Sequence, residues 1–176
     1  MQAEKALDFW LARANDPAKR PFGKYLHEHG VQIDRIARAR IDIDAARLVV
    51  CNAAIKIDEQ DAKHALKEIA EAKVLVPQVL MEVLDKAIQA YGGAGVCQDT
   101  PLARSWATSR TMRIVDGPDE VHLQQLGKNE NKRGKAAMRQ IERQKAKTAE
   151  LYKQYGIEHK DVLELNRVHA PTKSKL

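Results

Sequence analysis

Cysteine, aromatic residues and long apolar runs are all scarce in this sequence of 176 residues, and each scarcity excludes a class of protein. The two cysteines, Cys51 and Cys97, form no CxxC pair, so we predict neither a disulfide framework nor a zinc site. The histidines are scattered, and we predict no metal-binding residues. No run approaches the ~18 apolar residues of a membrane-spanning helix, and the N-terminus lacks the apolar stretch of a signal peptide. We therefore expect a soluble, non-secreted protein without a membrane span.

Strand patterns are also missing, because no stretch alternates β-branched and polar residues over the length of a strand. Hydrophobic residues make up 44% of the sequence and charged residues 31%, and residue types that favour helices predominate. A chain of this length can bury one core and is short for two domains. We therefore predict an all-α fold, an up-and-down four-helix bundle followed by a basic C-terminal helical extension.

Apolar residues spaced by three and four positions outline the helices of this bundle. A residue before proline avoids the helical region, so Pro17 ends the first helix, and the glycines from Gly92 to Gly95 end the third with a left-handed turn. Pro77 lies inside the third pattern, where we expect a kink rather than an end. After Gly156 we expect only a weak short helix and a tail. The predicted helices cover residues 2–14, 24 or 31 to 57, 62–91, 100–113, and 120 to 147 or 154.

Positive charge is concentrated at the C-terminal end. The formal net charge is +6, yet residues 127–176 hold 13 Lys or Arg against 6 Asp or Glu, and the first 126 residues hold 17 against 18. Such a segment suits nucleic acid or an acidic surface, or it is simply a solvated helix with a flexible end. No nucleic-acid-binding motif and no platform of aromatic residues accompanies the charge, so we predict no nucleic-acid partner.

The densest cluster of unusual residues lies between Ile88 and His122, where a glycine-rich break, a helix and an acidic turn follow one another. The break follows a helix and lacks the third glycine of a dinucleotide-binding fingerprint, which argues against that fold. Its glycines either cap the helix or let a phosphate or flavin approach backbone amides. The turn DGPDE begins at Asp116. The carboxylate of this residue either favours the turn or is a catalytic group. The three carboxylates of this turn also suit the start of a helix.

The whole window, IQAYGGAGVCQDTPLARSWATSRTMRIVDGPDEVH, closely resembles the C-terminal region of acyl-CoA dehydrogenases. The nearest likeness is to the subgroup that carries ADGPDEVH at this turn. Two earlier segments agree: RPFGKYLHEHGV resembles the family's R-x-x-FGK-x-L-x-x-H segment, and KEIAEAKVLVPQVL resembles its KEIA-x-x-K helix. The similarity runs in order from about Ala6 to Glu130, so the chain is similar to the C-terminal helical domain of that family.

This resemblance implies FAD-dependent α,β-dehydrogenation of an acyl-CoA thioester, a step of fatty-acid oxidation. A carboxylate removes the α-proton while hydride leaves the β-carbon for the flavin. The family's base stands immediately before the glycine of the turn, and Asp116 takes that position; a carboxylate shielded from water has a suitable basicity. The resemblance also implies three sets of contacts with FAD. The loop residues Lys19, Arg20 and Phe22 form the first set. The second set, from Gln89, Ala90, Tyr91, Gly92 and Gly93, is to the FAD of a neighbouring subunit, and the third, from Pro118, Asp119 and Glu120, is to the adenosine part of the subunit's own FAD.

The sequence departs from the family in several ways. Lys19 replaces the arginine that holds the FAD pyrophosphate and keeps the charge but not the two-pronged geometry, although Arg20 is next to it. Gly30 replaces a glutamine that is common after the residue matching His29. Family members also carry an N-terminal helical domain and a middle β-domain, and nothing here replaces them. We expect a truncated product or a domain fragment that binds FAD poorly alone; the alternative is a non-catalytic helical module that oligomerises with full-length relatives.

The resemblance further implies acyl-CoA as the substrate and a homodimer or homotetramer formed through the bundle. The last three residues, Ser174, Lys175 and Leu176, match the C-terminal signal that the peroxisomal import receptor reads. Because peroxisomal fatty-acid oxidation fits the family, we predict localisation in the peroxisomal matrix. The predicted division is a bundle over residues 1–130, a basic extension and tail over 131–173, and the targeting signal over 174–176.

Overall fold

The fold is given by a computed structural model that describes residues 2–157. Within that range the chain forms helices and turns and no strand, which confirms the all-α prediction. None of these helices is long and apolar enough to cross a membrane. In chain order the elements are α1 (Gln2–Ala14), η1 (Pro21–Gly23), η2 (Leu26–Glu28), α2 (Gly30–Glu59), α3 (Leu66–Tyr91), α4 (Gly93–Val96), α5 (Leu102–Thr111), α6 (Asp119–Asn131) and α7 (Gly134–Tyr155).

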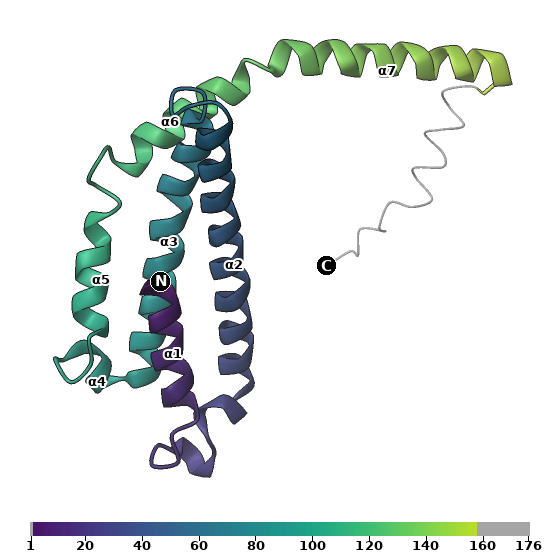
Figure 1. The fold of residues 1–176 in the computed structure, drawn as a ribbon. Helices are drawn as coiled ribbons and strands as arrows, with labels where there is room; N and C mark the ends of the chain where they lie inside the picture. The colour runs from purple at the N-terminus through teal and green to yellow at the C-terminus, as the bar shows by residue number, and fades with distance from the viewer. Residues whose placement is uncertain (1, 158–176) are drawn as a thin grey trace, which may run out of the picture. The chain divides into compact units, whose positions relative to one another are not determined.

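The chain divides into two compact units, Met1–Lys128 and Asn129–Leu176. In the first unit α2 and α3 run side by side in opposite directions, α1 lies against both, and α5 packs on α3 (Figure 1). The chain direction therefore alternates from α1 to α2, α3 and α5, as in an up-and-down bundle. Taken by itself, the second unit contains α7, which buries none of its residues.

The core of the first unit lies where α1, α2, α3 and α5 meet. Trp10 of α1 is fully buried and packs in one cluster with Ile43 of α2, Leu84 of α3 and Leu102 of α5. Its indole Nε1 donates to Oε1 of Gln32, a buried side chain on α2, at 3.1 Å. The one polar atom of the indole thus has a partner, which avoids the cost of an unpaired buried donor.

Charged residues hold the N-terminal part of α1 against α2. The Glu4 carboxylate accepts hydrogen bonds from Arg40 and Arg47, which lie two turns apart on α2. The hydrogen bond from Arg40 and both positive charges hold the pKa of Glu4 below its ordinary value. Because α1 has 13 residues and α2 has 30, their lengths are about 20 Å and 45 Å. The short helix therefore leaves part of the α2–α3 surface uncovered.

Three details differ from the sequence-based expectations. Helix α3 begins at Leu66 rather than Ala62, because Asp61 accepts the backbone N–H of His64 at 2.9 Å and forms a turn of its own. The glycine-rich break contains the short helix α4. The predicted fifth helix is interrupted at residues 132–133 and becomes α6 and α7. The weak helix expected after Gly156 and the C-terminal signal lie outside the described residues.

Candidate functional site

The acidic turn, residues 116–120, joins α5 to α6 and presents Asp116 to solvent. Asp116 has φ 53° and Gly117 has φ 94°, so two successive residues adopt the left-handed region, which Asp tolerates better than most non-glycine residues. A ring nitrogen of His122 lies 3.2 Å from the Asp116 carbonyl oxygen. A Cβ atom on Gly117 would lie 3.1 Å from the same His122 ring. The turn is therefore folded back on the first turns of α6, with its first carboxylate outward.

Asp119, at the start of α6, points into the protein. Only 2% of its surface is exposed. Its Oδ2 accepts from Nε of Arg113 at 2.6 Å and from Nε2 of Gln78 at 3.5 Å, while Oδ1 is buried without a partner among the described residues. Burial opposes ionisation, but the hydrogen bonds from Arg113 and Gln78 and the charges of Arg113 and Lys73 outweigh it and lower the pKa of this carboxyl. Asp119 therefore anchors the turn from inside, while the neighbouring Pro118 and Glu120 are exposed.

The glycine segment, residues 89–93, ends α3. Gly92 has φ 64° and ψ −134°, and its N–H donates to the Ile88 carbonyl at 3.0 Å. This backbone conformation is open to glycine and not to other residues. No atom lies within 4 Å of a Cβ built on Gly92 or Gly93, so the backbone is freely approachable on that side. Gln89 is exposed, whereas Ala90 is buried in the core.

Tyr91 is half-buried at the same place. Its ring stacks at a tilt on Phe9, with 6.3 Å between centroids, and the Arg13 guanidinium lies 5.5 Å from its centroid. Nε of Arg13 donates to the Ala90 carbonyl oxygen at 3.2 Å. Burial raises the pKa of the Tyr91 hydroxyl, and the nearby Arg13 charge opposes this rise in part. The end of α1 thus fixes the end of α3.

The basic loop, residues 19–22, follows α1 and carries an aromatic side chain in water. Phe22 is 96% exposed and has φ 56°, a conformation that is an outlier for a bulky residue. Next to it, the Arg20 guanidinium lies 4.6 Å from the centroid of Tyr25, and Lys19 is exposed. The Phe22 ring lies edge-on to His29, with 6.3 Å between the ring centroids, and strained backbone of this kind is common at binding sites.

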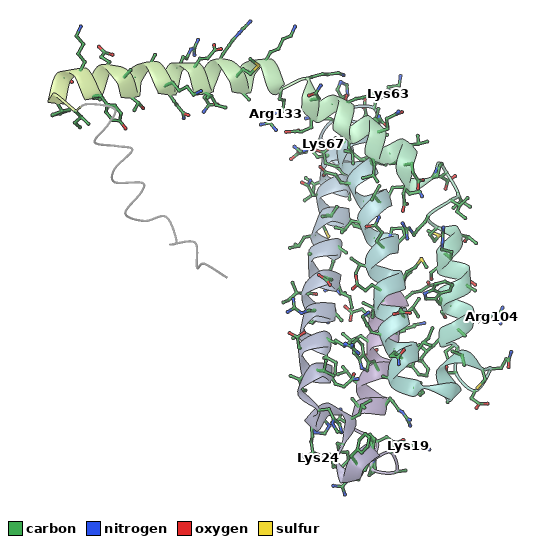
Figure 2. All side chains as sticks on the ribbon, turned by 180° about the vertical axis from the view of Figure 1, so that it is seen from behind. Lys19, Lys24, Lys63, Lys67, Arg104 and Arg133 are labelled. Atoms are coloured by element: carbon green, nitrogen blue, oxygen red, sulfur yellow. The ribbon has the colours of Figure 1, made fainter. Side chains whose placement is uncertain are left out.

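The predicted site residues fall into two groups. The basic loop and the glycine segment share one end of the first unit, where α1 and α3 both end (Figure 1). Figure 2 shows Lys19 and Lys24 at that end. The acidic turn lies at the other end of α5, a helix of 10 residues and about 15 Å. Asp116 is therefore not brought together with the basic loop.

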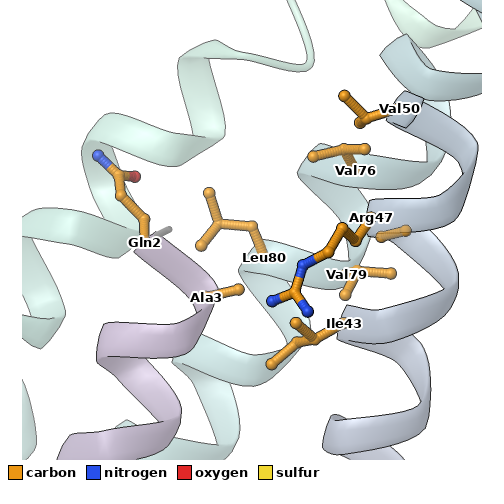
Figure 3. A pocket seen from close by; sticks show the side chains of 9 residues that line it. Gln2, Ala3, Ile43, Arg47, Val50, Val76, Val79 and Leu80 are labelled. Carbon is orange, nitrogen blue, oxygen red and sulfur yellow. The ribbon is translucent and has the colours of Figure 1, made fainter. Parts of the chain in front are cut away.

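The first unit also contains an apolar cavity of about 290 Å³, which lies between the N-terminus of α1 and the helices α2 and α3. Figure 3 shows Ala3, Leu80 and Val76 around it, with the Arg47 side chain extending from α2 toward Ala3. None of the predicted catalytic or FAD-contacting residues lines this cavity. It belongs to the uncovered part of the α2–α3 surface rather than to the acidic turn or the basic loop.

Comparison with known proteins shows which family the chain belongs to. The sequence model described as acyl-CoA dehydrogenase, C-terminal domain, matches residues 1–130. The chain belongs to the acyl-CoA dehydrogenase family. Both site groups and all of the bundle lie inside the matched range, whereas α7 lies outside it.

Individual acyl-CoA dehydrogenases agree with this assignment. The protein of Arabidopsis thaliana named probable acyl-CoA dehydrogenase IBR3 is 44% identical over 74% of this chain and 16% of its own length. The protein of Mycobacterium tuberculosis named probable acyl-CoA dehydrogenase FadE2 is 44% identical over 76% of this chain and 32% of its own length. The structure of butyryl-CoA dehydrogenase from Megasphaera elsdenii superposes with a TM-score of 0.67 at 30% identity, covering 73% of this chain and 32% of that one. The chain thus spans a third or less of these relatives.

Acyl-CoA dehydrogenases use FAD, and the residues at the α1–α3 end suit such a group. Lys19 and Arg20 offer positive charge to a pyrophosphate, and Phe22 offers a ring face. The open backbone of Gly92 and Gly93 allows close approach, as phosphate groups require. The donor chemistry of this end therefore fits the cofactor of the family.

Sequence reasoning missed the residues that hold these groups in place. Arg113 and Gln78 anchor the acidic turn through Asp119, and Arg13 anchors the glycine segment through Ala90. For Arg113 a signal existed, since an arginine three residues before Asp116 opens the conspicuous stretch RIVDGPDE. Gln78 and Arg13 lie 41 and 77 residues from their partners, and no local pattern marks them.

Proposed function

We propose that this chain supplies the C-terminal helical domain of a FAD-dependent acyl-CoA dehydrogenase and that Asp116 is its catalytic base. The observation that carries the proposal is the conformation of the acidic turn. Asp116 adopts φ 53° in front of Gly117, and its side chain is exposed while Asp119 is held inside. A carboxylate presented in this way, on a turn fixed at both ends, suits proton removal from a substrate docked against it.

The chemistry assigned to the chain is the removal of one proton. The thioester carbonyl acidifies the α-carbon of an acyl-CoA, and the Asp116 carboxylate takes that proton. When bound, FAD supplies the acceptor for the hydride that leaves the β-carbon. A carboxylate gains basicity when water is excluded from it, so the remaining domains of a complete enzyme would have to cover the acidic turn.

The FAD contacts proposed for this chain come from the α1–α3 end. Lys19 and Arg20 would hold the pyrophosphate, Phe22 would pack on the cofactor, and Gly92 and Gly93 would admit it to the backbone. As the resemblance to the family implies, we assign the glycine segment to the FAD of a neighbouring subunit. The acidic turn, through Pro118 and Glu120, would face the FAD of its own subunit.

A chimera tests the proposed base in a complete enzyme. Residues 1–130 would replace the matching bundle of the Megasphaera elsdenii butyryl-CoA dehydrogenase, and flavin bleaching by butyryl-CoA would be followed by absorbance. We expect Asp116→Asn to abolish bleaching while the chimera stays yellow. The matched control, Asp99→Asn, changes another exposed carboxylate, outside the turn, and should leave bleaching unchanged.

Retained bleaching in the Asp116→Asn chimera would assign the base elsewhere. The isolated chain provides a second measurement that does not depend on the chimera. We expect FAD titrated into it to bind weakly, since the chain spans a third or less of its relatives. Tight binding and reduction by acyl-CoA would show that the bundle is sufficient alone.

We further propose that the bundle assembles with a second copy through the outer face of α2. Ile41, Leu48 and Ile55 follow one another at intervals of seven, face away from α3, and are between 52% and 70% exposed. Heptad-spaced apolar residues on one face of a long helix are typical of helix–helix contacts. This stripe also supports the alternative of a non-catalytic oligomerisation module. Leu48→Glu should shift the sedimentation coefficient to that of a monomer, whereas Leu123→Glu, an exposed leucine of α6, should not.

The peroxisomal location remains a proposal that rests on Ser174, Lys175 and Leu176. These residues lie outside the described part of the chain. A fluorescent protein fused to the N-terminus should collect in peroxisomes, and removal of Leu176 should return it to the cytosol. An unchanged distribution after this removal would show that the terminal tripeptide is not the signal.

A further inference from the structure

Helix α7 carries an apolar stripe that covers nothing among the described residues of its unit. The helix has 22 residues, about 33 Å, and none of them is buried. Its larger apolar side chains recur at intervals of three, four and seven, so that they share one face. Met138, Ile141 and Tyr155 are exposed on this face, and Thr148 and Tyr152 lie between them.

The rest of the α7 surface is basic. The helix carries six Lys or Arg and two Glu, a net charge of +4. Five of the six cations, Lys135, Arg139, Arg143, Lys147 and Lys153, lie outside the stripe, by the angular spacing of 100° per residue. Lys145 stands within the stripe, where its long aliphatic stem can lie along an apolar surface and leave the ammonium in water.

Three occupants of this face can be weighed on charge and polarity. A second copy of α7 would bring two helices of net charge +4 together, which is unfavourable. A nucleic acid would neutralise the cations but would leave the apolar stripe in water. An anionic lipid surface accounts for both faces, because the stripe enters the boundary between headgroups and acyl chains while the cations meet the headgroups.

We propose that α7 is an amphipathic helix that binds an anionic membrane surface and lies in the plane of the headgroups. The site is separate from the acyl-CoA dehydrogenase bundle, because the family match ends at residue 130 and α7 begins at Gly134. No span is involved, since α7 is too polar to cross a bilayer. The helix thereby attaches the chain to a lipid surface.

Vesicle sedimentation with the full chain tests this proposal. Sucrose-loaded vesicles of equal parts phosphatidylcholine and phosphatidylserine should pull the chain down, and vesicles of phosphatidylcholine alone should not. Each Lys or Arg at such a surface contributes a factor of about five in binding, so Arg139→Gln with Arg143→Gln should weaken it about 25-fold. Added salt should weaken binding in the same direction.

A matched pair of neutral variants separates lipid insertion from simple charge attraction. Ile141→Gln with Tyr152→Gln removes the stripe without changing the charge and should lose sedimentation with the anionic vesicles. Ala136→Gln with Ala146→Gln makes the same kind of change outside the stripe and should bind like the wild type. Circular dichroism would verify equal helix content in both.

Three results would overturn the proposal. The first is undiminished sedimentation of the Ile141→Gln, Tyr152→Gln variant, which would show that the stripe does not enter the lipid. The second is equal binding to neutral and anionic vesicles. The third is binding to duplex DNA or to RNA, measured by fluorescence anisotropy, in the absence of vesicle binding, which would identify α7 as a nucleic-acid contact.

Discussion

Nε of Arg113 lies 2.6 Å from Oδ2 of Asp119, and this ion pair closes the acidic turn around Asp116. The backbone closes the same loop, since the Asp119 N–H donates to the Arg113 carbonyl oxygen at 3.3 Å. Arg113 and Asp119 are thus joined by a side-chain ion pair and by a backbone hydrogen bond. The conformation of Asp116 is therefore set by a pair that does not include it.

Loss of Arg113 should destabilise the bundle. Arg113→Ala leaves the buried Asp119 carboxylate with Gln78 as its one side-chain donor, which should lower the free energy of unfolding by about 1–3 kcal/mol. Urea denaturation followed by circular dichroism measures this difference. Arg110→Ala, an exposed arginine one turn earlier on α5, should stay within about 0.5 kcal/mol of the wild type. Equal stability of the two variants would mean that the ion pair does not form in solution.

The same pair predicts how stability depends on pH. Because the pKa of Asp119 is lower in the folded chain than in the unfolded one, its ionised form stabilises the fold. This contribution is fully present above the unfolded pKa of about 3.9 and is lost as the pH falls through the lower folded value. The stability difference between the wild type and Asp119→Asn should therefore be largest at neutral pH and shrink below about pH 4.

Urea midpoints at neutral pH and at about pH 3 provide the measurement. Other carboxyls with lowered pKa values, such as Glu4, are present in both proteins and cancel in the difference. A stability difference that stays constant over this range, or grows in acid, would contradict the assignment of an ionised, stabilising Asp119.

The helices could be predicted from sequence wherever local signals decide them. Helix α1 ends at Ala14 as expected, because apolar spacing and Pro17 both act within a few residues. Helix α3 continues through Pro77, as expected, because the apolar spacing runs on past the proline. The break before Gly134 was missed, since Lys132 and Arg133 are good helix formers.

The candidate site was predictable to a similar extent. The positive φ of Gly92 was predictable because the residue stands at a helix end. The place of Asp116 in a turn was predictable from the sequence DGPDE. The inward direction of Asp119 did not follow, because it depends on Gln78, which the fold brings from another helix. Pairs of this kind form only once the helices have packed.

Gly93 and Gly95, both in the glycine-rich break, differ in what an added Cβ atom would meet. A Cβ on Gly95 would lie 2.5 Å from the Ile88 carbonyl oxygen, a distance that forces the backbone to move. Gly95→Ala should therefore destabilise the bundle by about 1–3 kcal/mol in thermal or urea unfolding. Gly93→Ala meets no atom within 4 Å and lies in α4, so it should be neutral or slightly stabilising. A reversed order of the two variants would show that the packing of α4 on α3 differs in solution.

Phe22 should be dispensable for folding, which is what a residue kept for a partner or cofactor requires. Its ring is 96% exposed, and its φ of 56° costs a bulky residue about 1 kcal/mol. Phe22→Asn should therefore leave the unfolding free energy unchanged or raise it by up to about 1 kcal/mol, because Asn tolerates this conformation. Phe9→Asn provides the matched control, since Phe9 packs on Tyr91 and its loss should lower stability. If Phe22→Asn were as damaging as Phe9→Asn, the ring would pack within the bundle, and its proposed contact with FAD would lose its support.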